Sequence, residues 1–524
     1  MTNYSSNLPR ELYLAEHVRE LDRIAIEEYG IEGFTLMQRA GAVCFQSLQQ
    51  RWPETRRVLV FAGGGNNGGD GYVVAALARQ EGLLAQVVTL AAPEKLLGDA
   101  KIAWQWAKDN QVEIVSFEDF CEVGETCSLP TVLVDGMLGT GLDRALNDQY
   151  AQAVDLINNS GLPVLAIDIP SGLHADTGIP LGNAVVADVT ASFIGLKQGL
   201  LTGAAGNHAG TILFSDLDVP DEVYKHASAP APSAIRIDIN NAARQLEARR
   251  AASHKGDFGH VLVVGGDYGM GGAVLMAAEA AQRTGAGLVS VITRSQHRGG
   301  FLARRPEIMM AGTEDEHFDA SPLFAKASVV VVGPGLGSGE WSRLQLQRCL
   351  SAQVSENLPL VVDADGLNLL AERASEENAS NTLIKRDNWI LTPHPGEAAR
   401  LLNCERKEIG ANRFKAVRAL QEKWGGHCLL KGHGSLTLSP ADNDRVHLCS
   451  EGNPGMASGG MGDILAGIIA GLVAQGLDLD RALRAAVCIH AEAADLAAET
   501  GQRGLLATDL LPYIRQLVNT NQHN

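Results

Sequence analysis

Residues 452–476 read GNPGMASGGMGDILAGIIAGLVAQG, a glycine-rich loop followed by small apolar residues that are typical of a buried helix. At the start of such a helix, free backbone N–H groups and the helix dipole favour an anion, and the glycines let the backbone close on a phosphate. Asp463 at the junction would repel phosphate, but it suits removal of the proton from a hydroxyl group that attacks a phosphoryl group. A capping aspartate is the alternative, which the length and the five glycines of the loop disfavour.

Hydrophobic runs that end in glycine, aspartate, histidine or lysine precede this loop. They read ASVVVVGPGLG (327–337), LPLVVDADG (358–366), NWILTPHPG (388–396) and HCLLKGHGS (427–435). Continuous apolar strands that alternate with helices predict a parallel sheet covered on both faces. In such a sheet, ligands bind at the carboxyl ends of the strands, so the polar residues at these ends are candidates for a site.

The candidates at these strand ends differ in their chemistry. Asp363 and Asp365 could hold a metal or a hydroxyl group, or could cap a helix. His394 lies between two prolines, which present it rigidly to a ligand, although a single histidine is more often structural. Lys431 supplies a cation beside a glycine turn, which suits the phosphates of a nucleotide.

The first half of the chain contains a second glycine loop, in RRVLVFAGGGNNGGDGYVVAALARQEG at residues 56–82. The pattern predicts the strand, loop and helix of a Rossmann-like βαβ unit. Gly63, Gly65 and Gly68 have the GxGxxG spacing of dinucleotide-binding proteins. An NAD dehydrogenase would carry an acidic residue at the end of the next strand, but none occurs before Glu94, so an ordinary dehydrogenase is disfavoured.

Three predicted strand ends in this half carry Asn or Asp beside glycines. Asp135 follows one strand and Asp168 another, and the loop at 63–70 supplies the third set. Each aspartate alone could cap a helix, but three such ends together favour a binding site. Oxygen atoms from Asn67, Asp135 and Ser171 would suit a hard monovalent cation, and the lack of Cys and His argues against zinc. Lys197 follows a further strand, either as a phosphate or carbonyl partner or as a solvated surface lysine.

The composition limits the class of protein. A chain of 524 residues predicts two or three domains, and a formal net charge of −18 argues against a general nucleic-acid binder. The eight cysteines are scattered without a CxxC motif, which indicates reduced thiols in a cytoplasmic protein, with neither a disulfide framework nor a zinc site. We find no leader and no apolar run long enough for a membrane span, so we expect no membrane association. We also expect a homo-oligomer.

The motifs AGGGNNGGDG, VDGMLGTGL, AIDIPSGL and SFIGLKQGLL together resemble the NAD(P)H-hydrate epimerase family, over about residues 10–225. The resemblance implies that Asp168 is the acid/base at the hydrated ring carbon. It also implies that Asn67, Asp135 and Ser171 bind potassium. The residues that it assigns to the hydrated dinucleotide are Asn66, Asn67, Gly68, Gly69, Asp70, Gly139, Thr140, Gly141, Leu142, Asp143, Arg144, Ala145 and Asp168.

The motifs GPGLG, DADGLN, TPHPGE, KGHGS and GNPGMASGGMGD resemble the ADP/ATP-dependent NAD(P)H-hydrate dehydratases of the ribokinase-like superfamily, over about residues 235–515. Ser435 departs from the pattern, since related sequences often carry threonine there. The resemblance implies ADP as phosphoryl donor, magnesium as its companion and Asp463 as the base. It assigns Ala273, Gly335, His394 and Asp463 to the hydrated cofactor. It assigns Lys431, Gly432, His433, Gly434, Ser435 and Gly462 to the nucleotide.

The sequence therefore predicts an α/β protein with two three-layer sandwiches. We expect a Rossmann-like epimerase domain at residues 1–225, a linker at 226–240 and a ribokinase-like dehydratase domain at 241–524. The resemblances imply that the first domain interconverts the R and S hydrates of NADH and NADPH (NADHX and NADPHX). The second would dehydrate the S form with ADP, giving NAD(P)H, AMP and phosphate. A small-molecule kinase with a fused regulator and a non-catalytic NAD sensor are the alternatives.

Overall fold

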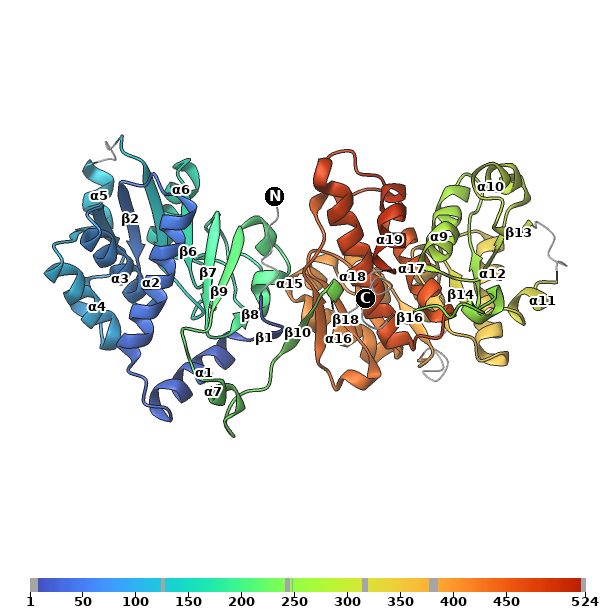
Figure 1. Ribbon diagram of the computed structural model, residues 1–524, viewed down its shortest axis with the longest axis horizontal. Helices are drawn as coiled ribbons and strands as arrows, with labels where there is room; N and C mark the ends of the chain where they lie inside the picture. Colours follow the sequence, from blue (N-terminus) through green and yellow to red (C-terminus); the bar gives the residue numbers. More distant parts are fainter. Residues whose placement is uncertain are drawn as a thin grey trace. The chain divides into compact units, whose positions relative to one another are not determined.

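The computed structural model describes residues 8–123, 128–240, 246, 248–312, 319–376 and 385–519 (Figure 1). The chain divides into two compact units, Met1–Ile235 and Arg236–Asn524. The division falls inside residues 226–240, the stretch expected to be a linker, and β10 (Ala234–Ile237) runs across it. Among the described residues, no helix combines the length and the apolar character needed to cross a membrane.

The first unit contains a seven-stranded sheet in the order β4-β3-β2-β5-β6-β7-β9, and every neighbouring pair is parallel. The strand order reverses at β2, which has β3 on one side and β5 on the other, so a crevice opens at the carboxyl ends of β2 and β5. The strands are β2 (Arg57–Ala62), β3 (Leu84–Thr89), β4 (Glu113–Ser116), β5 (Thr131–Gly136), β6 (Val164–Ile167), β7 (Val189–Phe193) and β9 (Thr211–Ser215). Separately, β1 (Glu11–Tyr13) pairs with β8 (Leu196–Lys197) and with the start of β10.

Helices cover both faces of this sheet, because alternate side chains of each strand point to opposite sides. Val58 and Val60 of β2 join a core that includes α1, α2, α3 and α4, whereas Leu59 and Phe61 join a core with α5 and α6. These helices are α1 (Ala15–Glu27), α2 (Gly33–Arg51), α3 (Asn66–Gln80), α4 (Gly98–Asp109), α5 (Phe117–Val123) and α6 (Asp148–Asn159). The short helix α7 (Asp221–Lys225) follows the last strand. The unit is thus a three-layer sandwich, as the sequence predicts (Figure 1).

The strands of the second unit follow the order β13-β12-β11-β14-β15-β16-β17-β18-β19. The pairs from β13 to β17 are parallel, whereas β18 and β19 are antiparallel additions. The strand predicted to end at Lys431 is β17, and the glycine turn that follows it leads into β18. The strands are β11 (His260–Val264), β12 (Leu288–Thr293), β13 (Met309–Gly312), β14 (Val329–Val332), β15 (Leu360–Val362), β16 (Trp389–Leu391), β17 (His427–Leu430), β18 (Ser435–Leu438) and β19 (Val446–Cys449).

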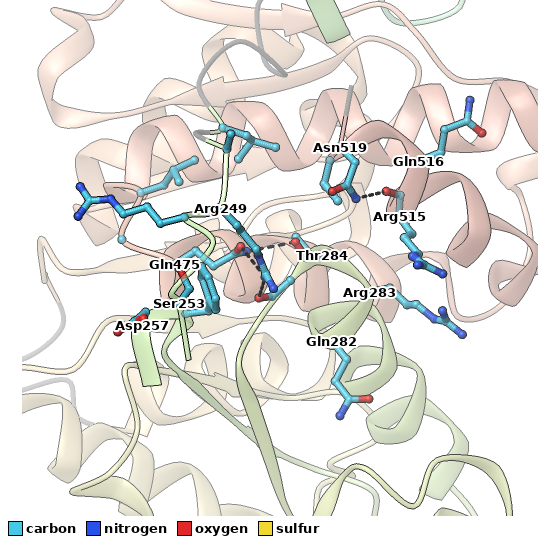
Figure 2. Close-up of a pocket in the computed structure, with 18 of the residues that line it drawn as sticks. Arg249, Ser253, Asp257, Gln282, Arg283, Thr284, Gln475, Arg515, Gln516 and Asn519 are labelled. Carbon is cyan, nitrogen blue, oxygen red and sulfur yellow. Dashed lines mark hydrogen bonds between the residues drawn. The ribbon is translucent and has the colours of Figure 1, made fainter. Parts of the chain in front are cut away.

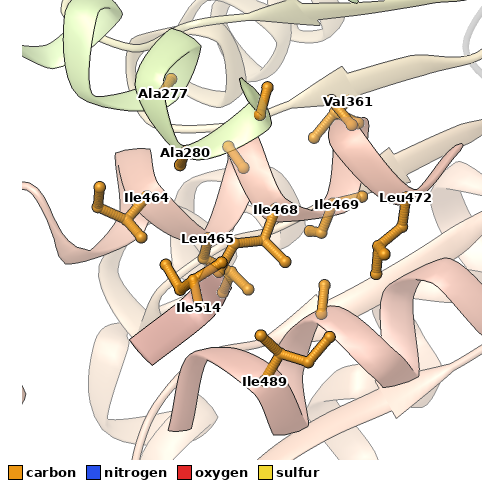
Figure 3. Packing of buried hydrophobic residues seen from close by; sticks show 14 of the residues in the cluster. Ala277, Ala280, Val361, Ile464, Leu465, Ile468, Ile469, Leu472, Ile489 and Ile514 are labelled. Atoms are coloured by element: carbon orange, nitrogen blue, oxygen red, sulfur yellow. The ribbon is translucent and has the colours of Figure 1, made fainter. Parts of the chain in front are cut away.

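One helical layer of this unit is built around α17, whose residues from Ile464 to Ala474 are all buried, as predicted (Figure 3). Gly467 lets α17 approach α9 closely, because a Cβ atom there would lie 2.2 Å from the carbonyl oxygen of Ala277. This layer consists of α9 (Gly271–Thr284), α17 (Met461–Ala474), α18 (Leu479–Ala497) and α19 (Leu511–Leu517).

The remaining helices include a set that packs along the strands from β14 to β17. They are α12 (Glu340–Ser355), α13 (Asp365–Glu376), α14 (Pro395–Leu402), α15 (Arg406–Ala411) and α16 (Arg413–Trp424). There are two further short helices. The helix α10 (Arg298–Arg304) contacts β13, and α11 (Ser321–Phe324) precedes β14 in the chain. The candidate site residues therefore lie at the carboxyl ends of the strands, in the loops and in the first turns of the helices that follow them.

Two candidate active sites

In the first unit, a cavity of about 480 Å³ opens at the crevice between β2 and β5. Predicted residues that line it are Asn66, Asn67, Asp70, Gly139, Thr140, Gly141, Leu142 and Asp168. Five predicted residues do not line the cavity: Gly68, Gly69, Asp143, Arg144 and Ala145. Of these, Gly68 and Gly69 are buried in α3. Helices α1 and α2 supply lining residues that the sequence analysis did not single out, such as Asp22 and Met37.

Glycines bring the two loops of this site together. A Cβ atom at Gly63 would lie 1.8 Å from the carbonyl oxygen of Met137, and one at Gly68 would lie 2.1 Å from that of Gly63. The loop after β2 can therefore rest against the loop after β5 only without side chains at these positions. As a result, Asn67 lies beside Gly139, and both polar atoms of its side-chain amide are buried without a hydrogen-bond partner. Buried polar groups are usually hydrogen-bonded, so this amide is a candidate for binding a ligand.

Asp135 and Ser171 form a buried pair at the same edge. The Ser171 hydroxyl donates to Oδ1 of Asp135 at 2.6 Å, and the Ser171 backbone N–H donates to Oδ2 at 2.7 Å. Burial raises the pKa of Asp135 to about 6, although the Ser171 hydrogen bonds oppose the rise. No basic side chain in the described part of the chain forms an ion pair with Asp135, so its negative charge has no protein counterion there.

Asp168 forms an ion pair with Lys197, and Lys197 is only 1% exposed. The Lys197 amine also donates to the carbonyl oxygen of Phe193 at 3.1 Å and to the hydroxyl of Ser192 at 3.4 Å. The interpretation of Lys197 as a solvated surface lysine is therefore wrong. Asp168 has a φ of +65°, a strained conformation for a non-glycine residue, and such strain is often found at functional sites.

Two further carboxylates surround this ion pair. Burial and the charge of Asp168 raise the pKa of Asp22 to about 7, against the opposing charge of Lys197. Burial also raises the pKa of Asp70 well above its usual range, and the charges of Asp168 and Asp22 add to the effect. Three carboxyl groups around one lysine keep at least one proton among them near neutral pH. Asp70, with its raised pKa, could therefore act as an acid beside the Asp168–Lys197 ion pair.

In the second unit, the carboxyl ends of β15, β16 and β17 meet the start of α17. The Lys431 amine lies 2.7 Å from Oδ1 of Asp363 and 4.0 Å from Oε2 of Glu397. The Thr392 hydroxyl donates to the same Asp363 oxygen at 2.8 Å. Burial lowers the pKa of Lys431, but the charges of Asp363 and Glu397 outweigh it and hold the pKa above its usual value.

Asp463 lies in the first turn of α17, beside this ion pair. The N-cap residue of α17 is Gly460, which has a φ of +93°, so Asp463 is the third residue of the helix and not its cap. Burial and the charge of Asp363 raise the pKa of Asp463 to about 7, although Lys431 lowers it. A Cβ atom at Gly462 would lie 3.2 Å from the Lys431 amine, so the loop closes directly on the ion pair. A carboxyl group with this pKa suits a general base near neutral pH.

His394 caps the neighbouring helix α14. Its Nδ1 atom accepts hydrogen bonds from the backbone N–H groups of Gly396 (2.9 Å) and Glu397 (3.3 Å), while Glu397 accepts from the His394 backbone at 2.7 Å. Burial and the charge of Lys431 lower the pKa of His394, so the ring is neutral with its proton on Nε2. The ring is about half exposed, and its predicted contact with substrate stays a prediction. Burial raises the pKa of Glu397, which the sequence analysis missed, to about 7.

The turn between β17 and β18 carries the predicted nucleotide contacts Gly432, His433 and Gly434. Arg413, buried on α16, holds this turn by donating to the carbonyl oxygens of Leu430 at 3.2 Å and Gly434 at 3.0 Å. Gly432 has a φ of +145°, and a Cβ atom there would lie 2.2 Å from Arg413 Nη1. Ser435 donates its hydroxyl to the Gly432 carbonyl oxygen at 3.2 Å, which the threonine of related sequences could also do.

The glycine loop after β14 joins the same edge. Gly333 packs against the carbonyl oxygen of Asp363, which a Cβ atom would approach to 1.8 Å, and Gly335 contacts the start of α9 beside Ala273. Asp365 accepts a hydrogen bond from the backbone N–H of Gly337 at 2.8 Å, so it holds this loop. The structure thus gathers the predicted substrate residues Ala273, Gly335, His394 and Asp463 at one end of the sheet.

The second unit also has a large hollow, which none of the predicted site residues lines. It has a volume of about 1790 Å³ and is lined by residues at the C-terminal ends of α9 and α17, such as Thr284 and Gln475 (Figure 2). The candidate active site lies at the N-terminal ends of those two helices. Size alone would therefore have pointed to the wrong end of the sheet.

Two α/β units, each with several carboxyl groups gathered around one lysine at the carboxyl ends of parallel strands, define a two-domain enzyme. Sequence comparison adds the family. The family model described as NAD(P)H-hydrate dehydratase matches residues 261–516, and the one described as YjeF-related protein N-terminus matches residues 33–199. The chain belongs to the family of bifunctional NAD(P)H-hydrate repair enzymes, in which an epimerase domain and a dehydratase domain are joined.

Individual relatives support this assignment. The chain is 44% identical to the bifunctional NAD(P)H-hydrate repair enzyme Nnr of Coxiella burnetii, over 97% of this chain and 99% of the relative. It is 39% identical to the enzyme of the same name from Escherichia coli K12, over 98% of this chain and 95% of the relative. A solved ribokinase-like superfamily protein from Enterococcus faecalis V583 is 28% identical and superposes with a TM-score of 0.50, covering 56% of this chain and 98% of that one. Both resemblances drawn from the sequence are confirmed.

Proposed function

We propose that the second unit dehydrates the S hydrate of NADH and NADPH by transferring a phosphoryl group from ADP to the ring hydroxyl. Hydroxide is a poor leaving group, whereas phosphate leaves readily when the nitrogen lone pair of the ring expels it, and loss of a proton from the adjacent ring carbon then restores the ring double bond. The hydroxyl proton passes to Asp463, the phosphorus–oxygen bond to AMP breaks, and the products are NAD(P)H, AMP and phosphate. The observation that carries this proposal is the position of Asp463, with its pKa near 7, beside the Lys431–Asp363 ion pair.

The surrounding residues fit the charges of such a reaction. The first turn of α17 offers backbone N–H groups to the transferring phosphoryl group, and the turn from Gly432 to Gly434 would contact the nucleotide. Asp363, Glu397 and Asp463 face the single cation of Lys431, and this excess of carboxylate oxygens fits magnesium. Bound there with the nucleotide, magnesium would neutralise phosphate charge.

In the first unit, we propose that Asp168, Lys197 and Asp70 interconvert the R and S hydrates. Inversion at the hydrated ring carbon would break its bond to the hydroxyl oxygen, which leaves with one added proton as water. Water would then add to the other face of the ring and give up one proton. Asp70, whose pKa is raised, would give the departing hydroxide its proton, and Asp168, paired with Lys197, would take a proton from the water that adds. The loops at 66–70 and 139–142 line the cavity in which the dinucleotide would lie.

The first site also fits potassium. The Asn67 amide oxygen is buried without a partner, and the buried Asp135 carboxylate has its hydrogen bonds from Ser171 and Met137 but no protein counterion in the described part of the chain. Amide, carboxylate and hydroxyl oxygens are ligands for a hard cation. Potassium bound by Asn67, Asp135 and Ser171 would hold the two glycine loops together and so fix the dinucleotide.

The test uses a mixture of R and S NADH hydrate with the full-length protein, ADP, magnesium and potassium, and follows the absorbance of NADH. Full recovery of NADH with an equal amount of AMP is expected. Recovery that stops at the S fraction would contradict the epimerase assignment. A stable phosphorylated product would support the kinase alternative, and tight binding without turnover would support the sensor. The homo-oligomeric state and the cytoplasmic location stay predictions, which light scattering and cell fractionation can check.

A further inference from the structure

Away from both sites, two cysteines and a glutamate converge in the second unit. Cys449 is the last residue of β19, Glu451 follows it by two residues, and Cys488 lies on α18. One ligand atom from each residue lies within 4.8 Å of the others. Cys449 Sγ is 3.8 Å from Oε2 of Glu451. Both thiols are buried, while Glu451 is partly exposed.

Local structure explains why these side chains meet. Residues two apart on an extended chain point to the same side, so Cys449 and Glu451 both face α18. Residues four apart on a helix share a face, which places the partly exposed Glu492 one turn beyond Cys488. The pattern is therefore Cys-x-Glu on the strand and Cys-x-x-x-Glu on the helix. The described residues of the two predicted active sites contain no cysteine ligand, so this cluster is separate from them.

We propose that Cys449, Glu451 and Cys488 bind a thiophilic divalent cation of the zinc class. Zinc binds thiolates at ~2.3 Å and carboxylates at ~2.0–2.2 Å in a tetrahedron, which requires donor atoms roughly 3.5 Å apart. Donors already within 4.8 Å reach that spacing by small side-chain rotations. Two sulfur donors disfavour magnesium, which demands oxygen ligands. Glu492 or water completes the tetrahedron, and the ion enters from the partly exposed side of Glu451.

The ion would act on the loop that carries the catalytic base. Glu451 directly precedes the glycine loop, whose first residues are already tied to α18. The backbone N–H of Gly452 and the side-chain amide of Asn453 each donate to Asp495 at 2.8 Å. A metal bridge between β19 and α18 adds a second tie at the same point. Binding releases the thiol protons and stabilises the folded second unit.

The test strips metal from the full-length protein with a chelator and titrates zinc against a chromophoric competitor in excess magnesium. Cys488→Ala removes one thiolate, and Cys349→Ala, another fully buried cysteine on α12, is the matched control. Wild type and Cys349→Ala should bind one more equivalent of zinc than Cys488→Ala. Loss of a ligand should weaken binding by more than the ~10–100-fold that follows loss of an outer-shell partner. Cobalt in place of zinc should give thiolate charge-transfer absorption.

Glu451→Gln keeps both thiols and serves if Cys488→Ala fails to fold; it should weaken zinc binding and leave the cobalt–thiolate band weaker or shifted. The proposal is overturned if wild type and Cys488→Ala bind zinc equally, or if the wild type cannot compete with the chelator. It is equally overturned if mass spectrometry finds Cys449 and Cys488 joined as a disulfide in protein that binds no zinc after reduction.

Discussion

The amine of Lys431 lies 2.7 Å from Oδ1 of Asp363, and Gly462 closes on this pair at the start of α17. The contact joins the end of β17 to the end of β15, and it places a fixed cation beside Asp463. Asp363 is the main partner of Lys431, and the charge of Lys431 also lowers the pKa of Asp463 against the effect of burial. The glycine turn that follows Lys431 is held separately, by Arg413.

The rate of dehydration should depend on pH through Asp463. The base works only when ionised, and its pKa is raised to about 7, so kcat/KM should rise with pH through 7 and then level off. Below the pKa, the rate should fall about tenfold for each pH unit. AMP formation from the S hydrate at constant ionic strength measures this, since it does not depend on acid-labile NADH. A profile without an inflection near 7 would argue against Asp463 as the base.

Gly462→Ala should impair dehydration while the protein stays folded. The added methyl group would lie 3.2 Å from the Lys431 amine and 3.3 Å from Oδ2 of Asp363, so it must push the ion pair or the loop aside. A loss in kcat of less than about 100-fold is expected, because ~100-fold follows a misplacement of roughly 1 Å and this contact requires a smaller shift. Gly459→Ala in the same loop is the control, because its Cβ atom would meet no atom within 4 Å. Equal activity of the two variants would show that close approach at Gly462 is not needed.

Lys197→Met should abolish epimerisation and spare dehydration of the S hydrate. Methionine nearly matches the length of the buried lysine but removes the charge that pairs with Asp168. Asp168 would then face Asp22 and Asp70 without the cation that balances these carboxyl groups. The loss should be on the order of 100-fold or more. R hydrate alone, supplied with ADP, reports epimerisation, and S hydrate alone is the control; normal recovery from the R form would refute the role of Lys197.

Replacement of potassium by tetramethylammonium should slow epimerisation by the wild-type protein. Asp135→Asn, which removes the buried charge but keeps the shape, should be slow in either salt. The comparison separates an ion effect from a general salt effect, because the variant lacks the proposed ligand. A wild-type rate that is identical in both salts would exclude potassium from the site.

Much of this architecture could be predicted from the sequence, since it resides in local patterns. Apolar runs ending in Asp, His or Lys predict the strand ends, and the glycine loop before Ile464 predicts a buried helix. Asp22 and Glu397 were missed, because their importance depends on neighbours distant in the chain. Asp22 carried a signal, since it falls on the buried stripe of α1 with Val18 and Leu21. Glu397 also has a local signal in the sequence, because it completes a capping box with His394.

Other features had no local signal. Arg413 supports the nucleotide turn from α16, and no motif links a helical arginine to a turn almost twenty residues away. The role of Lys197 was also left open, because burial of a lysine is decided by the tertiary packing of β7 and β8. Sequence patterns therefore found the strand ends, and tertiary structure showed which side chains meet there.

The most direct test compares Asp463→Asn and Asp168→Asn on a mixture of R and S NADH hydrate with ADP, following NADH and AMP together. The account predicts that Asp463→Asn yields neither product, with a rate reduced by ~10²–10⁴, while its epimerisation of the mixture persists. Asp168→Asn should convert the S fraction alone and stop. A folded single variant that loses both activities together would contradict the assignment of one reaction to each unit.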